Sequence, residues 1–202
     1  NINKNKKVFF CAHRPPGHHA EKNKAMGFGV FNNVAISADY ALRSKKFKKI
    51  LIIDFDVHHG NGTQHIFENN PDIFYASSHQ FPFYPGTGNL NEKGCGNIFN
   101  CPLPANCDSK LFRELFFKHI VDKINQNFDL LYFSAGFDAH MLDPLASINL
   151  EDDDFFWVTK IILDKFANNI PIISVLEGGY DMKGLYNGLN NHLKVLQEYS
   201  NE

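Results

Sequence analysis

The chain has 202 residues, 44% of them hydrophobic and 14% aromatic, so it can bury one core and is expected to form a single domain over residues 1–202. Its 20 lysine and arginine side chains against 22 aspartates and glutamates give a net charge of −2, which excludes a basic field that would draw it to nucleic acid or an anionic membrane. There is no secretory signal, no CxxC pair among the four cysteines and no apolar run near the roughly 20 residues of a membrane span, so an intracellular, cytoplasmic protein with reduced thiols is expected.

The predicted elements alternate between short apolar runs and longer amphipathic stretches. Five runs have strand length and the continuous apolar character of strands covered on both faces: Val8–Cys11, Ile50–Ile53, Ile73–Ala76, Leu130–Phe133 and Ile172–Leu176. Four stretches carry apolar residues at helical spacing: Phe31–Ser44, Lys110–Asn127, Asp153–Ala167 and Leu185–Tyr199. Asp108 or Ser109 is expected to begin the second of these helices. The alternation predicts an α/β fold with a largely parallel, multi-stranded sheet flanked by helices on both faces.

Polar and titratable side chains follow every predicted strand. In chain order they are His18 and His19, then Asp54, Asp56, His58 and His59, then Ser77, Ser78 and His79, then Asp138 and His140, and finally Glu177 and Tyr180. In open α/β sheets the carboxyl ends of the strands form the binding crevice. Five strand ends are therefore expected to bring their polar groups to one place.

The segment after the second strand has the pattern of a metal site. Asp54, Asp56 and His58 are spaced i, i+2 and i+4, so in extended chain they point the same way. Clustered carboxylates at a buried strand end repel one another, whereas a divalent cation makes the same cluster stable. Asp138 is the expected distant ligand, which leaves one of Asp54 and Asp56 for a supporting role. Two carboxylates and one imidazole leave open positions, as in catalytic metal sites. A capped or salt-bridged loop would explain any one of these residues, but not the whole constellation.

Six motifs in order carry a resemblance to a known family: RPPGHHA, GFGVFNN, DFDVHHGNGT, PGTG, SAGFDAH and EGGY. Together they resemble the zinc-dependent histone deacetylase family, which includes bacterial deacetylase-like amidohydrolases and acetylpolyamine amidohydrolases. The resemblance runs from about Val8 to the C-terminus. It implies an arginase/deacetylase-like fold and the removal of an acetyl or other acyl group from acetyl-lysine or a related acetylated amine.

The resemblance also implies the ligands and the ions. Asp56, His58 and Asp138 would hold one catalytic zinc ion, and Asp54 would orient a histidine of the neighbouring pair. A potassium ion is implied beside Asp54, the backbone around His58 and the Ser77–Ser78 segment.

Further site residues follow from the same resemblance. His19 would transfer protons, His18 paired with Asp54 would be its electrostatic partner, and Tyr180 would donate its hydroxyl to the oxyanion. The residues expected to bind the substrate are Gly27, Phe28, Tyr84 and Gly179, with the two aromatic rings lining a narrow channel. By themselves, Phe28 and Tyr84 would be read as ordinary core residues.

Two departures from the family pattern add expectations. Asn61 stands where class I members carry aspartate, so the sequence agrees with the class II and bacterial branch, and the pKa of His19 should be raised less than beside a carboxylate. In the family a substantial stretch precedes the first motif, whereas only residues 1–7 precede Val8 here. The chain is therefore expected to be an N-terminally incomplete catalytic domain.

Two other classes of protein stay open. The first is a binuclear manganese ureohydrolase, because arginase-like enzymes share this fold type and carboxylate-rich ligation suits manganese. A two-metal site needs more bridging carboxylates than the sequence offers. The second is a non-catalytic module that binds acyl-lysine or another subunit. The expected substrate is an acetylated lysine peptide or an acetylated polyamine, and the oligomeric state is not determined by the sequence.

Overall fold

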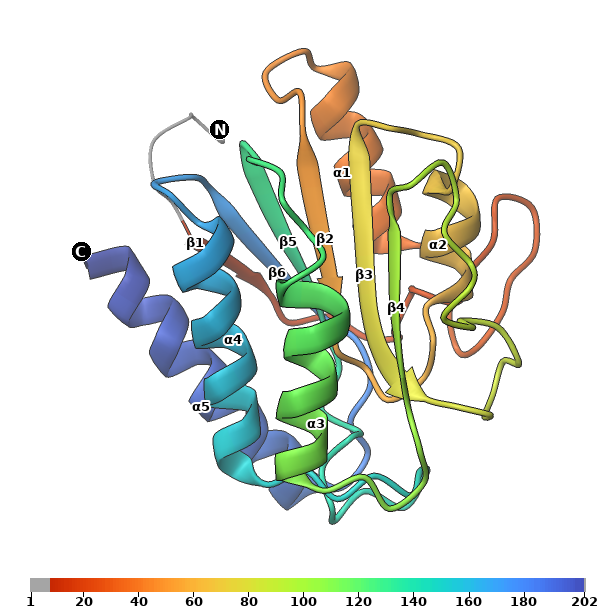
Figure 1. Ribbon diagram of the computed structural model, residues 1–202, viewed down its shortest axis with the longest axis vertical. Helices are drawn as coiled ribbons and strands as arrows, with labels where there is room; N and C mark the ends of the chain where they lie inside the picture. The colour runs from red at the N-terminus through yellow and green to blue at the C-terminus, as the bar shows by residue number, and fades with distance from the viewer. Residues whose placement is uncertain (1–7, 202) are drawn as a thin grey trace.

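Six parallel strands form the central sheet of the protein, a computed structural model that describes residues 8–201 (Figure 1). The strands lie in the order β1-β6-β5-β2-β3-β4. Their bounds are β1 Val8–Cys11, β2 Ile50–Asp54, β3 Ile73–Gln80, β4 Ile98–Leu103, β5 Leu130–Ala135 and β6 Ile172–Leu176. All five neighbouring pairs are parallel, which confirms the predicted sheet type.

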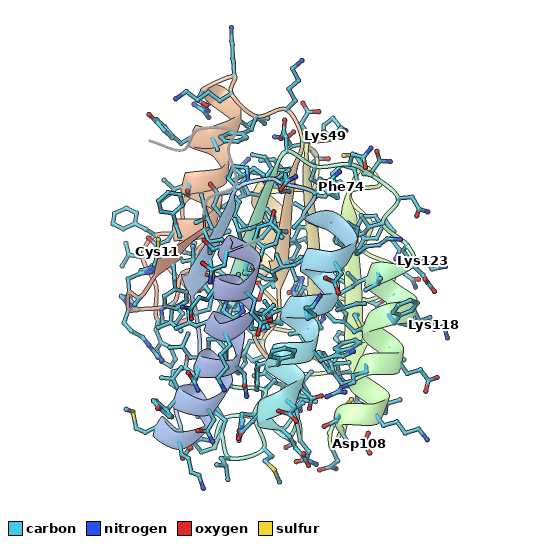
Figure 2. All side chains as sticks on the ribbon, turned by 90° about the vertical axis from the view of Figure 1, so that its left-hand side faces the viewer. Cys11, Lys49, Phe74, Asp108, Lys118 and Lys123 are labelled. Carbon is cyan, nitrogen blue, oxygen red and sulfur yellow. The ribbon has the colours of Figure 1, made fainter. Side chains whose placement is uncertain are left out.

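Helices cover both faces of the sheet, as predicted. They are α1 Asn33–Arg43, α2 Asn61–Phe67, α3 Ser109–Phe116 followed by the π-helical turn η1 Phe117–Val121, α4 Asp152–Phe166 and α5 Met182–Asn201. Figure 2 shows α5, α4 and α3 side by side over one face, and α1 and α2 lie behind the sheet in Figure 1. Asp108 caps α3 by accepting a hydrogen bond from the Leu111 amide at 2.9 Å, as the sequence predicted.

Two cores lie against the two faces because side chains alternate along each strand. On β2, Leu51 and Ile53 belong to the core under α3, α4 and α5, whereas Ile50 and Ile52 belong to the core under α1. All five β2 residues are buried. Continuous apolar strands thus mark a sheet that is covered on both sides, and this burial orders the strand ends that carry the polar groups.

The sequence prediction missed two elements and misplaced several boundaries. β3 runs to Gln80, so Ser77, Ser78 and His79 lie within the strand and not after it as predicted. β4 was missed because Asn100 and Pro102 interrupt its apolar character; proline is tolerated there because β4 is an edge strand. α2 was missed because it has only seven residues and begins inside the polar DFDVHHGNGT segment. The helix predicted to run to residue 127 ends at Val121 with a π-helical turn.

Candidate metal and catalytic site

The carboxyl ends of the strands bring the predicted site residues together around one cavity. In Figure 1 the arrowheads of β2 and β3 point to the lower edge of the sheet, where the strand-end loops gather. The cavity has a volume of about 230 Å³ and is lined by Pro16, His18, His19, Gly27, Phe28, His58, Tyr84, Leu145 and Tyr180. Asp54 lies beneath it at the end of β2, in register with Ser77 of β3 and Ser134 of β5.

Asp56, His58 and Asp138 form a compact set of ligand atoms. One donor atom from each lies within 4.8 Å of the other two. His58 Nδ1 is 3.2 Å from Asp56 Oδ1 and 3.1 Å from Asp138 Oδ2. Main-chain amides hold both carboxylates: Gly178 N donates to Asp56 Oδ2 at 2.8 Å, and Val57 N donates to Asp138 Oδ1 at 2.9 Å. The two carboxylates are thus fixed by backbone contacts from two separate loops, and His58 lies against both of them.

The electrostatics of this set show that the three side chains interact strongly. Burial raises the pKa of Asp138 to about 7, helped by the neighbouring charge of Asp56. Burial lowers the pKa of His58, but hydrogen bonds to the two carboxylates outweigh it and raise that pKa to about 10. Burial also works against ionisation of Asp56, yet His18 and His58 hold its pKa well below its usual value. Two buried carboxylates therefore need a positive charge between them, which a protonated His58 or a divalent cation can supply.

The donor set and its surroundings fit a divalent metal ion. Histidine nitrogens and carboxylate oxygens both ligate zinc, and three protein ligands leave the fourth position open, as in catalytic zinc sites. Gly178 approaches so closely that a Cβ at this position would overlap carboxylate oxygens of both Asp56 and Asp138. The absence of a side chain there keeps space at the carboxylates.

The paired histidines lie beside the metal-ligand set and have different partners. His18 Nδ1 is 3.0 Å from Asp54 Oδ2, and the rings of His18 and His19 are 4.1 Å apart. Burial opposes a charge on His18, but Asp56 and Asp54 outweigh it and raise its pKa well above 6.5. Burial, together with the charge of His18, lowers the pKa of His19 to about 3. The pair therefore combines one cationic and one neutral imidazole.

Asp54 supports the site from below. Its Oδ1 accepts a hydrogen bond from the Asp56 amide at 3.1 Å, and its Oδ2 accepts one from the Tyr75 hydroxyl at 2.8 Å in addition to facing His18. The residue spacing left open whether Asp54 or Asp56 is the metal ligand. Asp54 lies outside the compact ligand set, which favours Asp56 as the ligand. Tyr75, on β3, was not singled out from the sequence, where it reads as one more strand aromatic.

Aromatic rings form the walls of the cavity. Phe28 and Tyr84 are 65% and 46% exposed, so they are not core residues. The Phe28 ring lies 5.8 Å from the Tyr180 ring, and the Tyr84 ring lies 5.1 Å from the His19 ring. Gly27 has φ +61, and a Cβ there would overlap the His19 ring, so glycine is required beside this histidine.

Three residues at or beside the cavity were not singled out from the sequence. Phe83 stacks on His58 with ring centroids 5.5 Å apart, while Pro16 and Leu145 line the cavity. Pro16 lies within the RPPGHHA motif, and Phe83 lies two residues before the PGTG motif. Leu145 follows Asp138 by seven positions, and nothing in its surroundings marks it in the sequence.

Tyr180 faces the cavity with a free hydroxyl. This hydroxyl has no hydrogen-bond partner within residues 8–201, and burial, with Asp56 and Asp138 nearby, raises the pKa of Tyr180 above its usual value, so the proton stays on at neutral pH. The main chain at this position is held by Asp143, whose Oδ2 accepts a hydrogen bond from Tyr180 N at 2.6 Å.

Reciprocal hydrogen bonds connect the histidine loop to the loop of Tyr180. Arg14 donates to Gly179 O at 2.6 Å, and Glu177 Oε2 accepts from Gly17 N at 2.6 Å and from His18 N at 3.2 Å. The expected substrate-binding position Gly179 is thus a backbone anchor for Arg14. Sequence reasoning noted Glu177 and Arg14 only as parts of motifs, because their partners lie about 160 residues away along the chain.

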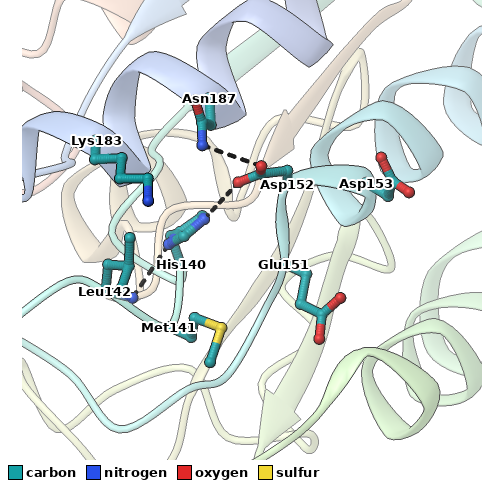
Figure 3. A pocket seen from close by; sticks show the side chains of 8 residues that line it. All are labelled: His140, Met141, Leu142, Glu151, Asp152, Asp153, Lys183 and Asn187. Carbon is teal, nitrogen blue, oxygen red and sulfur yellow. Dashed lines mark hydrogen bonds and ion pairs between the residues drawn. The ribbon is translucent and has the colours of Figure 1, made fainter.

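A second, polar hollow of about 420 Å³ lies near the start of α4 (Figure 3). His140, two residues after Asp138, points there toward Asp152, with His140 Nε2 2.8 Å from Asp152 Oδ1, while Asn187 donates to Asp152 Oδ2 at 3.0 Å. His140 Nδ1 accepts from the Leu142 amide at 3.1 Å. His140 therefore ties the Asp138 loop to α4 rather than joining the first cavity.

Comparison with known proteins agrees with this fold and site. The histone deacetylase domain family matches residues 1–196 of the chain. Fold and site thus place the chain among the α/β proteins of the deacetylase and amidohydrolase class. The chain belongs to the histone deacetylase family, which confirms the resemblance drawn from the six motifs. No helix within residues 8–201 has the length and apolar character needed to cross a membrane.

Individual relatives show how far the similarity extends. An uncharacterized protein of Synechocystis is 44% identical over 197 residues, which cover 96% of this chain and 64% of that protein. Chloroplastic histone deacetylase 14 of Arabidopsis thaliana is 42% identical over 197 residues, covering 94% of this chain and 46% of that protein. The solved structure of acetylpolyamine aminohydrolase from Burkholderia pseudomallei has a TM-score of 0.86 at 32% identity and covers 95% of this chain and 57% of that one. The chain thus spans between about half and two thirds of the length of these proteins.

Proposed function

We propose that the protein is a zinc-dependent deacetylase that hydrolyses the amide bond of acetyl-lysine or of a related acetylated amine. One observation carries this proposal. The compact set of Asp56, His58 and Asp138 adjoins a histidine pair and a free tyrosine hydroxyl around one aromatic-walled cavity. Relatives named as deacetylases and as an acetylpolyamine aminohydrolase support the same reaction class.

The proposed roles follow from the contacts of each residue. Asp56, His58 and Asp138 would hold the zinc ion. A zinc ion in such a site polarises a substrate carbonyl and lowers the pKa of water toward about 7. His19 lines the cavity, and with Nδ1 facing Asn61 its Nε2 can accept the proton of the attacking water, then return it to the departing amine. His18, charged beside Asp54, stabilises negative charge that develops nearby. Tyr180 donates its hydroxyl to the carbonyl oxygen as that oxygen becomes negative.

The channel residues explain why an extended aliphatic amide is the proposed substrate. Phe28 and Tyr84 present exposed rings at the cavity, and Leu145 adds an apolar side chain to the same wall. Apolar walls suit the methylene chain of lysine or of a polyamine, whose amide would then reach the polar floor. The potassium ion implied by the family resemblance stays a prediction. Both Asp54 oxygens already accept hydrogen bonds from protein groups.

Acetate release from an acetyl-lysine peptide and from an acetylated polyamine tests the proposal, with the zinc content of the protein measured in parallel. We expect turnover by the zinc-loaded chain, and neither zinc nor turnover in Asp138→Ala. A folded chain that binds one zinc ion but turns over neither substrate would favour the non-catalytic module. Two metal ions per chain would favour the binuclear ureohydrolase; within residues 8–201 the structure has one cluster of potential ligands.

A further inference from the structure

The neutral partner of His19 is itself held by a carboxylate. Asn61 is 2% exposed, and its Oδ1 lies 2.8 Å from His19 Nδ1. On its other side, Asn61 Nδ2 donates to Glu21 Oε1 at 2.5 Å and to His19 O at 3.3 Å. Three side chains thus form a line that runs from the cavity outward: His19, Asn61 and Glu21.

This line determines which way the Asn61 amide faces. A carboxylate and a main-chain carbonyl can only accept hydrogen bonds, so the amino group of Asn61 must face Glu21 and His19 O. The amide oxygen is then left to face His19 Nδ1. With the amide reversed, its oxygen would lie against the negative charge of Glu21, and its amino group would lie against His19 Nδ1.

The orientation of Asn61 in turn selects the tautomer of His19. Because Asn61 Oδ1 can only accept, the proton of the neutral imidazole must be on Nδ1. His19 Nε2 is then unprotonated, and it has no hydrogen-bond partner within residues 8–201. A reversed amide would place the proton on Nε2 and remove the base from the cavity.

Glu21 is held in place by contacts outside the cavity. His65 Nδ1 is 2.8 Å from Glu21 Oε1, and Glu21 N donates to Lys24 O at 2.9 Å. Asn61 and His65 are four residues apart on α2, so one helical turn presents both side chains to the same carboxylate. The Glu21 side chain is 19% exposed and does not line the cavity.

We propose that Glu21 is a positioning residue that fixes the Asn61 amide and, through it, keeps His19 in the Nδ1-protonated tautomer. The inference rests on the proton-transfer role proposed for His19. Glu21 touches neither the substrate cavity nor the metal-ligand set, so it acts only through Asn61. An aspartate partner would favour the proton on His19 Nδ1 through its negative charge. By fixing the amide, Glu21 lets the neutral Asn61 favour the same tautomer.

A comparison of Glu21→Ala in two backgrounds tests this role. In the native background we expect kcat to fall about tenfold, equivalent to about 1.4 kcal/mol, with KM within twofold of wild type, and Glu21→Gln to recover part of the loss because its amide oxygen still accepts from Asn61. In Asn61→Asp, either carboxylate oxygen can accept a hydrogen bond from His19 Nδ1, so the side chain at position 61 works in both orientations and does not need Glu21. Glu21→Ala should there leave kcat unchanged or raise it by removing a like charge.

An equal loss of kcat in both backgrounds would overturn the proposal and make Glu21 a structural residue. Glu114→Ala, the same change at an exposed position of α3 across the sheet, is the matched control and should keep kcat within twofold of wild type. Nitrogen-15 NMR of labelled histidine in the zinc-loaded protein reads the tautomer directly. We expect unprotonated Nε2 at His19 in the wild type and a mixture of tautomers in Glu21→Ala; an unchanged spectrum would refute the role. The NMR measurement does not require turnover. Failure of the proposed deacetylase function can therefore be distinguished from failure of the role proposed for Glu21.

Discussion

Tyr180→Phe removes one oxygen atom from the site and leaves its surroundings in place. The ring keeps its edge contact with Phe28 at 5.8 Å and stays beneath the Arg14 guanidinium, 5.4 Å from the ring centroid. The main-chain hydrogen bond to Asp143 is also kept. Because the hydroxyl has no partner within residues 8–201, its loss leaves no buried group unsatisfied. We expect the free energy of unfolding to change by about 0.5 kcal/mol or less.

The effect on catalysis should be far larger. Removing one donor to a developing oxyanion typically costs about 10²–10³ in kcat, or about 2.7–4 kcal/mol. The interaction forms mainly in the transition state, so KM should stay within about twofold while kcat falls. Zinc content should not change, because Tyr180 lies outside the compact ligand set.

Acetate release, zinc content and urea unfolding of Tyr180→Phe would measure these three effects together. Tyr186→Phe is the matched control, since Tyr186 is 70% exposed on α5 and lies outside the cavity lining. Turnover by Tyr180→Phe at the wild-type rate would refute the oxyanion role. A loss of turnover accompanied by a loss of zinc or of stability would show that the tyrosine acts on the structure instead.

Two further predictions concern the packing around the site and the core. Gly178→Ala would place a methyl group against Asp56 and Asp138. We expect zinc affinity, measured by competition with a chelator, to fall about tenfold or more. An unchanged affinity would show that the loop can move to accommodate the methyl group. His192, on α5, is fully buried and its pKa is lowered to about 3 by that burial. The unfolded chain therefore takes up this proton between about pH 6.5 and pH 3 while the folded chain does not, so stability falls as the pH falls. From pH 7 to pH 5 this residue should cost about 2 kcal/mol in the free energy of unfolding. Urea unfolding of His192→Gln should lack that part of the loss, and equal losses in both proteins would contradict the argument.

The apolar pattern of short segments was sufficient to predict most strands of the sheet. The five apolar runs became β1, β2, β3, β5 and β6. β2, β3, β5 and β6 are buried at every position, as expected for strands covered on both faces, whereas β1 is an edge strand with Phe9 and Cys11 exposed, so the two-sided cover predicted for it is wrong. β4 was not predictable in this way, since an edge strand containing Asn100 and Pro102 lacks that run. Its place in the sheet depends on pairing with β3, which is a contact between separate parts of the chain.

The sequence alone also determined which residues meet at the site. Parallel strands deliver their carboxyl ends to one edge, so the positions after each run predicted without any coordinates that His18, His19 and Tyr180 would lie near Asp56 and Asp138. Motif order then identified the family. Both inferences use information that lies within a few residues of each strand end.

Only the tertiary structure decided which hydrogen bonds fix these residues and how their pKa values are shifted. Glu177 accepts from the amide of Gly17 and Glu21 orients Asn61, in contacts that join segments 160 and 40 residues apart. Burial then shifts the pKa values of neighbouring carboxylates and imidazoles in opposite directions, as between His18 and His19. Such shifts depend on desolvation and on distances of about 3 Å between side chains. No local pattern encodes those quantities, because they exist only once the strands have packed and the loops have closed over them.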